Sequence, residues 1–194
     1  MERKITKERR TGETDIRVKI NLDGKGVHQI ATGIGFFNHM LELFSRHSGI
    51  DIDLEARGDL DVDMHHTVED VGIILGEAIR EALGDKKGIE RYGDIALPMD
   101  ESLVQVALDI SNRPYLVFHV PEGFKGVMGR FDSELVEEFM VAFSANLRLN
   151  LHINVLYGKN LHHIAEGIFK GLARALKKAI QITGTSIPST KGVL

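Results

Sequence analysis

The sequence predicts an α/β fold of the two-layer, α+β kind that is duplicated within one chain. Two adjacent histidines followed by a glutamate occur twice, as HHTVE at residues 65–69 and as HHIAE at residues 162–166. Apolar residues with helical spacing follow each copy, and they match at pairs such as Leu75 and Leu172. Each copy also closes the same series of expected elements, which is strand, strand, helix, strand, helix. Two similar halves account for all three observations.

The first half opens with a strand in which apolar and polar side chains alternate. Within residues 13–22, Ile16, Val18 and Ile20 share one face, which is typical of a half-buried strand. The other elements of this half follow in order. They are a strand at 27–32, a helix near 36–47, a strand at 50–56 and the first motif helix, which Gly84 ends after Leu83.

The series restarts after residues 84–98, a segment rich in glycine and charge that we interpret as the joint between the halves. The second half predicts strands at 104–110 and 115–120, a Gly-rich loop at 121–130, a helix from about 133 to 146, a strand at 149–155 and the second motif helix, which ends near Ile182. The pseudo-repeats thus cover about 10–85 and 99–182 of one domain at 1–194, and a tail follows at 183–194.

Composition excludes several classes of protein. The 194 residues are 43% hydrophobic and 27% charged, as in ordinary globular domains. A net charge of −4 offers no basic surface for nucleic acid. The sequence contains neither a membrane-spanning apolar run nor the apolar core of a signal peptide. Because cysteine is absent, disulfides are excluded, and we expect a cytoplasmic protein.

Each repeated motif places possible metal ligands at the start of a helix. At 3.6 residues per turn, Glu69 shares a face with His65 and His66, whereas the two adjacent histidines diverge by roughly 100°. The simplest interpretation is two ions, with each repeat contributing to both. Imidazole and carboxylate groups suit manganese, iron or zinc. A His–Glu ion pair at a helix start is the plainer alternative, and the repetition counts against it.

A second pair of corresponding positions extends this set. His39 and Glu138 stand near the start of the earlier helix in each half, upstream of a motif. Both side chains are potential metal ligands. The plainer alternative for Glu138 is a carboxylate that complements a helix dipole.

Several motifs in a fixed order carry a resemblance to a known family. They are Arg10-Thr11 with Glu13-Thr14, FFNHM at 36–40, HHTVED at 65–70, DISNRP at 109–114, GKNLHHIAE at 158–166 and PSTKG at 188–192. In these motifs the chain resembles imidazoleglycerol-phosphate dehydratases over nearly its whole length. The resemblance implies halves with a four-stranded sheet and two helices each, of the ribosomal protein S5 domain 2-like type. It also implies a homo-oligomer of twenty-four subunits, built from trimers, with metal sites completed between subunits.

The resemblance implies a lyase of histidine biosynthesis with two manganese ions per active site. D-erythro-imidazoleglycerol phosphate would lose water to give imidazole-acetol phosphate, with the substrate imidazole bound as imidazolate between the ions. The family's metal ligands fall on His39, His65, His66, Glu69, Glu138, His162, His163 and Glu166. At Glu138 the chain departs from the common pattern, in which this ligand is a histidine. A carboxylate also binds manganese, and the alternative is that Glu138 lies beside a water ligand.

The chemistry explains why such groups are needed. The proton to be removed lies next to an imidazole ring and not next to a carbonyl, so the ring must be the electron sink. A side chain must then move protons at two carbons. The resemblance assigns this to Glu13, with His47 second, although an exposed strand-edge glutamate is ordinary. The residues that match the family's phosphate-binding positions are Arg91, Arg113, Lys170, Ser189, Thr190 and Lys191.

Two other functions share part of this pattern. A dinuclear metallophosphohydrolase would use the same metals and cations but would turn over a generic phosphoester. A non-catalytic, metal-binding cage would explain the repeated motif without Glu13, Arg91 or Arg113. The ordered motifs favour the dehydratase over both.

Overall fold

The computed structural model describes residues 2–194, and its elements confirm the duplication. The first half comprises β1 (Lys4–Arg10), β2 (Thr14–Asn21), β3 (His28–Ala31), α1 (Gly35–Ser48), β4 (Asp51–Gly58) and α2 (His65–Leu83). The second comprises β5 (Tyr92–Met99), β6 (Ser102–Asp109), β7 (Tyr115–His119), the short β8 (Val127–Met128) and β9 (Phe131–Asp132), α3 (Glu134–Leu147), β10 (Asn150–Tyr157) and α4 (Leu161–Ala179).

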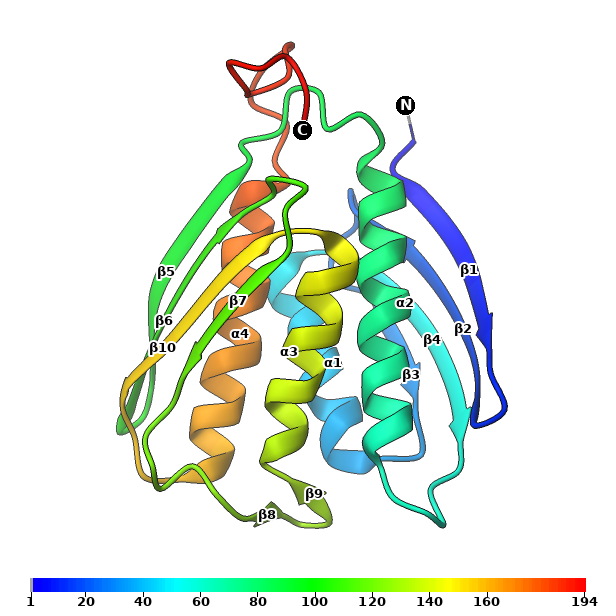
Figure 1. Cartoon of the computed structure of the whole chain (residues 1–194), viewed down its shortest axis with the longest axis vertical. Helices are drawn as coiled ribbons and strands as arrows, with labels where there is room; N and C mark the ends of the chain where they lie inside the picture. Colours follow the sequence, from blue (N-terminus) through cyan, green and yellow to red (C-terminus); the bar gives the residue numbers. More distant parts are fainter. Residues whose placement is uncertain (1) are drawn as a thin grey trace.

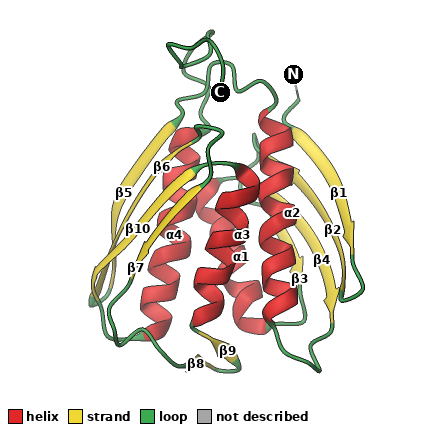
Figure 2. Ribbon diagram, viewed as in Figure 1, coloured by secondary structure: helices red, strands yellow, loops and turns green. Residues whose placement is uncertain are grey.

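The two four-stranded sheets have the same topology. The strand orders are β1-β2-β4-β3 and β5-β6-β10-β7, and in each sheet only the last pair is parallel. Each half is a two-layer unit of one sheet and two helices. The halves pack through their helices, so that four helices lie between two outer sheets (Figures 1 and 2).

The helices of opposite halves pack against one another in crossed pairs. α2 lies along α3, and α1 lies along α4. Phenylalanines join these pairs, with Phe44 of α1 edge-on to Phe143 of α3 at 5.7 Å between ring centroids. Because every helix borders the other half, neither sheet–helix unit buries its apolar face without its counterpart.

Two strands that alternation did not reveal lie at the sheet edges. β1 is largely polar, and its half-buried side chains include Lys7 and Arg9, which pair with Glu77 and Asp70 of α2. β5 occupies much of the segment that we expected to be the joint, so the pseudo-repeats begin at β1 and β5 rather than near residues 10 and 99. Pro98 is tolerated because β5 is an edge strand. Gly93 is required because a Cβ there would lie 1.9 Å from the Ala175 carbonyl oxygen of α4.

The ends of the helices agree closely with the pattern. Gly84 follows α2 with a φ of 56°, as expected for a residue that ends a helix. α4 ends at Ala179, slightly before the expected Ile182. No helix within residues 2–194 is long and apolar enough to cross a membrane.

Candidate metal centre and phosphate-binding residues

All four helices begin at the same end of the molecule, which is the lower end in Figure 1. The repeated motifs open α2 and α4, while His39 and Glu138 lie within the first turns of α1 and α3. The crossed packing therefore brings each of these two residues to the motif of the other half.

One cluster forms where α1 meets α4. His39, His162 and Glu166 each offer a ligand atom, and these atoms lie within 4.8 Å of one another. His39 Nε2 is 3.5 Å from Glu166 Oε1, whose side chain is only 8% exposed. Lys170, one turn further along α4, approaches the same oxygen at 3.1 Å. Two imidazoles and a buried carboxylate fit one divalent ion such as manganese, iron or zinc.

At the equivalent contact of α2 with α3, one histidine–carboxylate pair forms. His65 Nε2 lies 3.9 Å from Glu138 Oε1, and both side chains are partly exposed. Glu69 lies one turn after His65 on the same helix and is half-buried. Glu138 thus holds the place that His39 holds in the first cluster, beside the first histidine of a motif.

The second histidine of each motif contacts carboxylates in the connections that join or follow strands. His66 Nδ1 lies 3.0 Å from Asp59 Oδ2, and His66 Nε2 lies 3.6 Å from Glu13 Oε1. The hydrogen bond with Asp59 raises the pKa of His66. A carboxylate at Nδ1 orients the ring and leaves Nε2 as the ligand atom.

His163 has the corresponding surroundings in the other half. Its Nδ1 lies 2.6 Å from Glu101 Oε2, and its Nε2 lies 3.5 Å from Asp100 Oδ2. The hydrogen bond with Glu101 raises the pKa of His163, and the same bond holds the pKa of Glu101 well below its usual range. Sequence reasoning missed Asp59, Asp100 and Glu101. Their place in turns at this end of the sheets is the signal that could have found them.

Local hydrogen bonds hold the start of each motif helix. Asn160 caps α4 by accepting from the backbone N–H groups of His162 and His163, at 2.9 and 3.3 Å. At α2, the Asp63 carboxylate accepts from the His65 N–H at 2.7 Å. Both hydrogen bonds hold the backbone at the first histidine of each motif.

Arg91 and Arg113, which we expected to bind phosphate, lie at the opposite end of the molecule. The Arg91 N–H donates to the Ala179 carbonyl at the end of α4, whereas the motif histidines open that helix. The Arg113 carbonyl accepts from Asn150, close after the end of α3. The 19 residues of α4 span about 28 Å. A single chain therefore does not bring these arginines to its own metal clusters.

The tail accompanies Arg91 at that far end. The Arg91 guanidinium donates to the Pro188 carbonyl at 2.8 Å and pairs with Asp109 at 2.7 Å, which raises the pKa of Arg91. Ser189, Thr190 and Lys191 follow directly (Figure 1). Of the expected phosphate ligands, only Lys170 lies beside the candidate metal ligands of its own chain.

His47 lies near the end of α1, between the histidines at the helix starts and the arginines at the opposite end of the molecule. Burial and the nearby Lys170 and Arg174 lower its pKa, which favours the neutral ring. A neutral imidazole is able to accept a proton.

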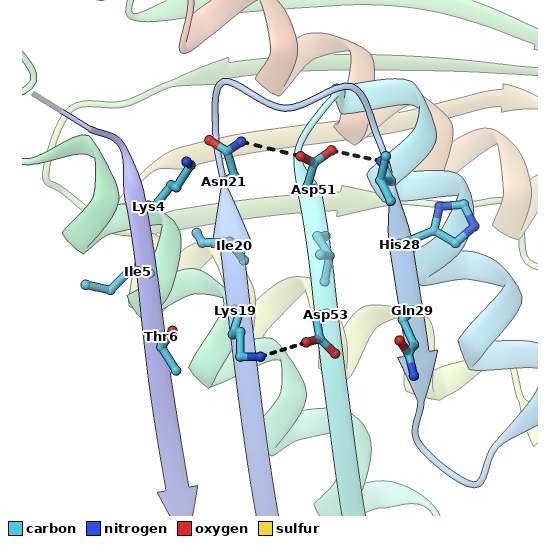
Figure 3. A pocket seen from close by; sticks show the side chains of 12 residues that line it. Lys4, Ile5, Thr6, Lys19, Ile20, Asn21, His28, Gln29, Asp51 and Asp53 are labelled. Atoms are coloured by element: carbon cyan, nitrogen blue, oxygen red, sulfur yellow. Dashed lines mark hydrogen bonds and ion pairs between the residues drawn. The ribbon is translucent and has the colours of Figure 1, made fainter.

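A hollow on the outer face of the first sheet contains none of these groups (Figure 3). Its charged side chains pair across strands, as Lys19 does with Asp53 at 3.1 Å. Asp51 accepts backbone N–H groups of Lys25 and Val27 and so holds the β2–β3 connection. These residues have structural roles.

Fold and site together define an internally duplicated α/β protein that gathers histidines and carboxylates where its four helices begin. Residues 32–176 match the family model described as imidazoleglycerol-phosphate dehydratase. The chain belongs to the imidazoleglycerol-phosphate dehydratase family, and it is an enzyme of the dehydratase type that serves histidine biosynthesis. This membership confirms the resemblance of the motifs and favours a lyase over a metallophosphohydrolase or a non-catalytic cage.

Relatives and solved structures agree over almost the whole chain. An imidazoleglycerol-phosphate dehydratase from Azorhizobium caulinodans is 60% identical over 190 residues, which cover 96% of this chain and 95% of the relative. One from Oceanobacillus iheyensis is 54% identical, over 99% and 100% of the two chains. The crystal structure of the Staphylococcus aureus enzyme matches with a TM-score of 0.83 at 43% identity, covering 93% of this chain and 99% of that one. The Pyrococcus furiosus enzyme in complex with (S)-C348 matches equally well, at 40% identity, covering 97% and 100%.

Proposed function

We propose that this chain converts D-erythro-imidazoleglycerol phosphate to imidazole-acetol phosphate and water, with two manganese ions per active site. The observation that carries the proposal is that histidines and carboxylates of both halves meet at two equivalent helix contacts, as the cluster of His39, His162 and Glu166 and as the pair of His65 with Glu138. Two such contacts suit a substrate ring with two nitrogens. Manganese is favoured because the donors are imidazole and carboxylate with no thiolate.

The residues that would hold the ions are the first histidine and the glutamate of each motif, with His39 and Glu138 from the facing helices. His66 and His163 present Nε2 toward other directions and would complete sites with ligands from neighbouring copies. When bound, the two ions withdraw charge from the substrate imidazole, which favours loss of its ring proton and makes the ring the electron sink.

Glu13 is the group that we assign to proton transfer at the substrate carbons. It lies in the turn between β1 and β2, and its carboxylate is exposed 3.6 Å from His66 Nε2. It therefore stands beside a proposed ligand and remains open to the substrate. A positioned carboxylate acting as acid or base typically contributes about 10²–10⁴-fold in rate. His47, whose pKa is lowered by burial and by the nearby Lys170 and Arg174, is our second candidate for the group that accepts the proton.

The phosphate would be bound by residues from more than one copy. Lys170 lies beside Glu166 in the same chain, whereas Arg91, Arg113 and the tail lie at the far end of α4, a helix whose 19 residues span about 28 Å. The substrate spans only on the order of 8 Å from ring to phosphorus. We therefore assign these residues to the site of a neighbouring copy, at the end where its helices begin, which supports an assembly with sites between subunits. Its size of twenty-four subunits stays a prediction. Its cytoplasmic location stays a prediction.

One assay tests substrate, reaction and metal together. Protein stripped of metal by a chelator is incubated with imidazoleglycerol phosphate, and formation of the ketone is followed before and after manganese is added. We expect product only after manganese. Absence of product with metal bound, or turnover of a generic phosphoester, would contradict the proposal.

A further inference from the structure

The turn that carries Glu13 is held by the side chain of Thr11. The Thr11 hydroxyl oxygen accepts from the backbone N–H groups of Glu13 and Thr14, at 3.1 and 3.0 Å. The Thr11 N–H in turn donates to the Thr14 carbonyl at 2.9 Å. These bonds fix the backbone of Glu13 although its side chain is exposed.

Below this turn, a buried carboxylate anchors Thr14. Asp70 and Thr14 are only 6% and 4% exposed, and the Thr14 hydroxyl donates to Asp70 Oδ2. The other oxygen, Oδ1, accepts from Arg9 Nε at 2.8 Å. Asp70 lies four residues after His66, so the helix that presents the metal ligands also holds the turn of Glu13.

The direction of the hydroxyl bonds follows from their chemistry. An ionised carboxylate only accepts, so the single hydroxyl proton of Thr14 goes to Asp70. The two hydroxyl oxygens of Thr11 and Thr14 lie 3.2 Å apart, so Thr11 must be the donor in that contact. The result is a one-way chain from Thr11 through Thr14 to Asp70, in which the charge at its end strengthens each bond.

Tight packing around Thr14 holds this series of hydrogen bonds in place. Gly58 pairs with Thr14 across β2 and β4, and a Cβ at Gly58 would lie 2.0 Å from Thr67 Oγ1 of α2. The β2–β4 surface thus meets the first turn of α2 with no room for adjustment beneath Thr14.

We infer that Asp70 is a positioning residue for the dehydration: through Thr14 and Thr11 it holds the Glu13 carboxylate at a fixed place beside the start of α2. This inference rests on the proposed role of Glu13. It gives Asp70 a task beyond its ion pair with Arg9. A displacement of about 1 Å at a reacting group costs up to about 10²-fold in rate. We therefore expect the hydrogen bonds from Thr11 through Thr14 to Asp70 to affect turnover more than substrate binding.

The test uses the assembled, manganese-loaded enzyme and variants that differ by one hydroxyl group. Thr14→Val removes the hydroxyl at nearly constant volume, whereas Thr14→Ser keeps it. We expect Thr14→Val to lower kcat by about 10- to 100-fold with KM and manganese content unchanged. Thr14→Ser should stay within a few-fold of the unaltered enzyme. Thr6→Val, on the exposed face of β1, is the matched control and should have no effect.

Two further comparisons separate positioning from simple stability. Arg9→Met breaks the ion pair but leaves the hydroxyl chain, so kcat should be retained. In a Glu13→Gln background, Thr14→Val should lower kcat no further, because it acts through Glu13. Amide hydrogen exchange of the peptide covering 11–14 should be faster in Thr14→Val, which reports the turn without any turnover.

Each result decides the inference. Unchanged kcat in Thr14→Val, or an equal further loss in the Glu13→Gln background, would overturn it. If Thr14→Val does not fold, Thr11→Val provides the same test, because Thr11 is the exposed member of this series of hydrogen bonds. Full activity of Glu13→Gln alone would instead show that the proposed role of Glu13 is wrong, and the inference would fall with it.

Discussion

The contact between the halves makes a quantitative prediction at Gly76. This residue lies in the middle of α2, and a Cβ there would lie 2.7 Å from the Phe143 carbonyl oxygen and 2.9 Å from the Leu147 nitrogen of α3. Both are backbone atoms within a helix, so they cannot rotate away. In Gly76→Ala the two helices must separate by about 0.5–1 Å to restore ordinary contact distances.

The expected cost is the difference between two opposing effects. Overpacking a tight contact costs about 1–3 kcal/mol, and alanine recovers up to about 1 kcal/mol of helix propensity over glycine. We expect a net loss of about 1–2 kcal/mol, which corresponds to roughly 2–8 °C in Tm for a chain of this size. Because α2 carries His65 and α3 carries Glu138, manganese binding should weaken as well.

Thermal unfolding and manganese titration of Gly76→Ala measure both effects. Gly35→Ala is the matched control, since a Cβ at the start of α1 meets nothing within 4 Å. Its Tm should equal or exceed that of the unaltered chain. A Gly76→Ala protein as stable as this control would refute the idea that close α2–α3 contact holds the halves together.

Three further predictions concern the site. Asn160→Ala removes the cap of α4, so it should cost about 1 kcal/mol of stability and weaken manganese binding, while the exposed Asn154→Ala serves as control in thermal melts and metal titrations. His47 binds a proton less tightly when folded than when unfolded, so its own contribution to the free energy of unfolding should decrease as pH drops below about 6.5. Over that range the unaltered chain should therefore lose stability relative to His47→Asn in urea titrations of metal-free protein. Removing the metal with a chelator should reduce the size of the assembly in light scattering, because His66 and His163 would lose their shared ions; an unchanged size after complete removal would contradict this.

The sequence predicted the parts of this structure that depend on local pattern. Alternating residues such as Ile16 and Val18 face the core of the first sheet, and the repeated motif placed histidines at helix starts. Alternation did not predict the strands β1 and β5, because edge strands need few apolar residues. A segment that contains Gly93 and Pro98 resembles a loop in the sequence. Only the close approach of α4 shows that Gly93 belongs to a strand.

The grouping of site residues was beyond local pattern. His39 precedes the motif of its own half in the sequence, yet it packs against His162 and Glu166 of the other half. This pairing depends on how two apolar helix surfaces meet, which no spacing along the chain specifies. Asp59 and Glu101 were missed for the same reason, since acidic residues in turns are usually only solvated.

We propose that each active site combines two copies of the chain. One copy contributes the end where its helices begin, with His39 and Glu166, and the other contributes the opposite end, with Arg91 and Arg113. Glu166→Gln impairs the first end, and Arg113→Ala impairs the second. The two inactive variants are mixed without metal and reassembled with manganese. Random mixing should restore up to about a quarter of the sites, and with them measurable dehydration of imidazoleglycerol phosphate. Mixed assemblies with no activity above either variant alone would contradict the claim.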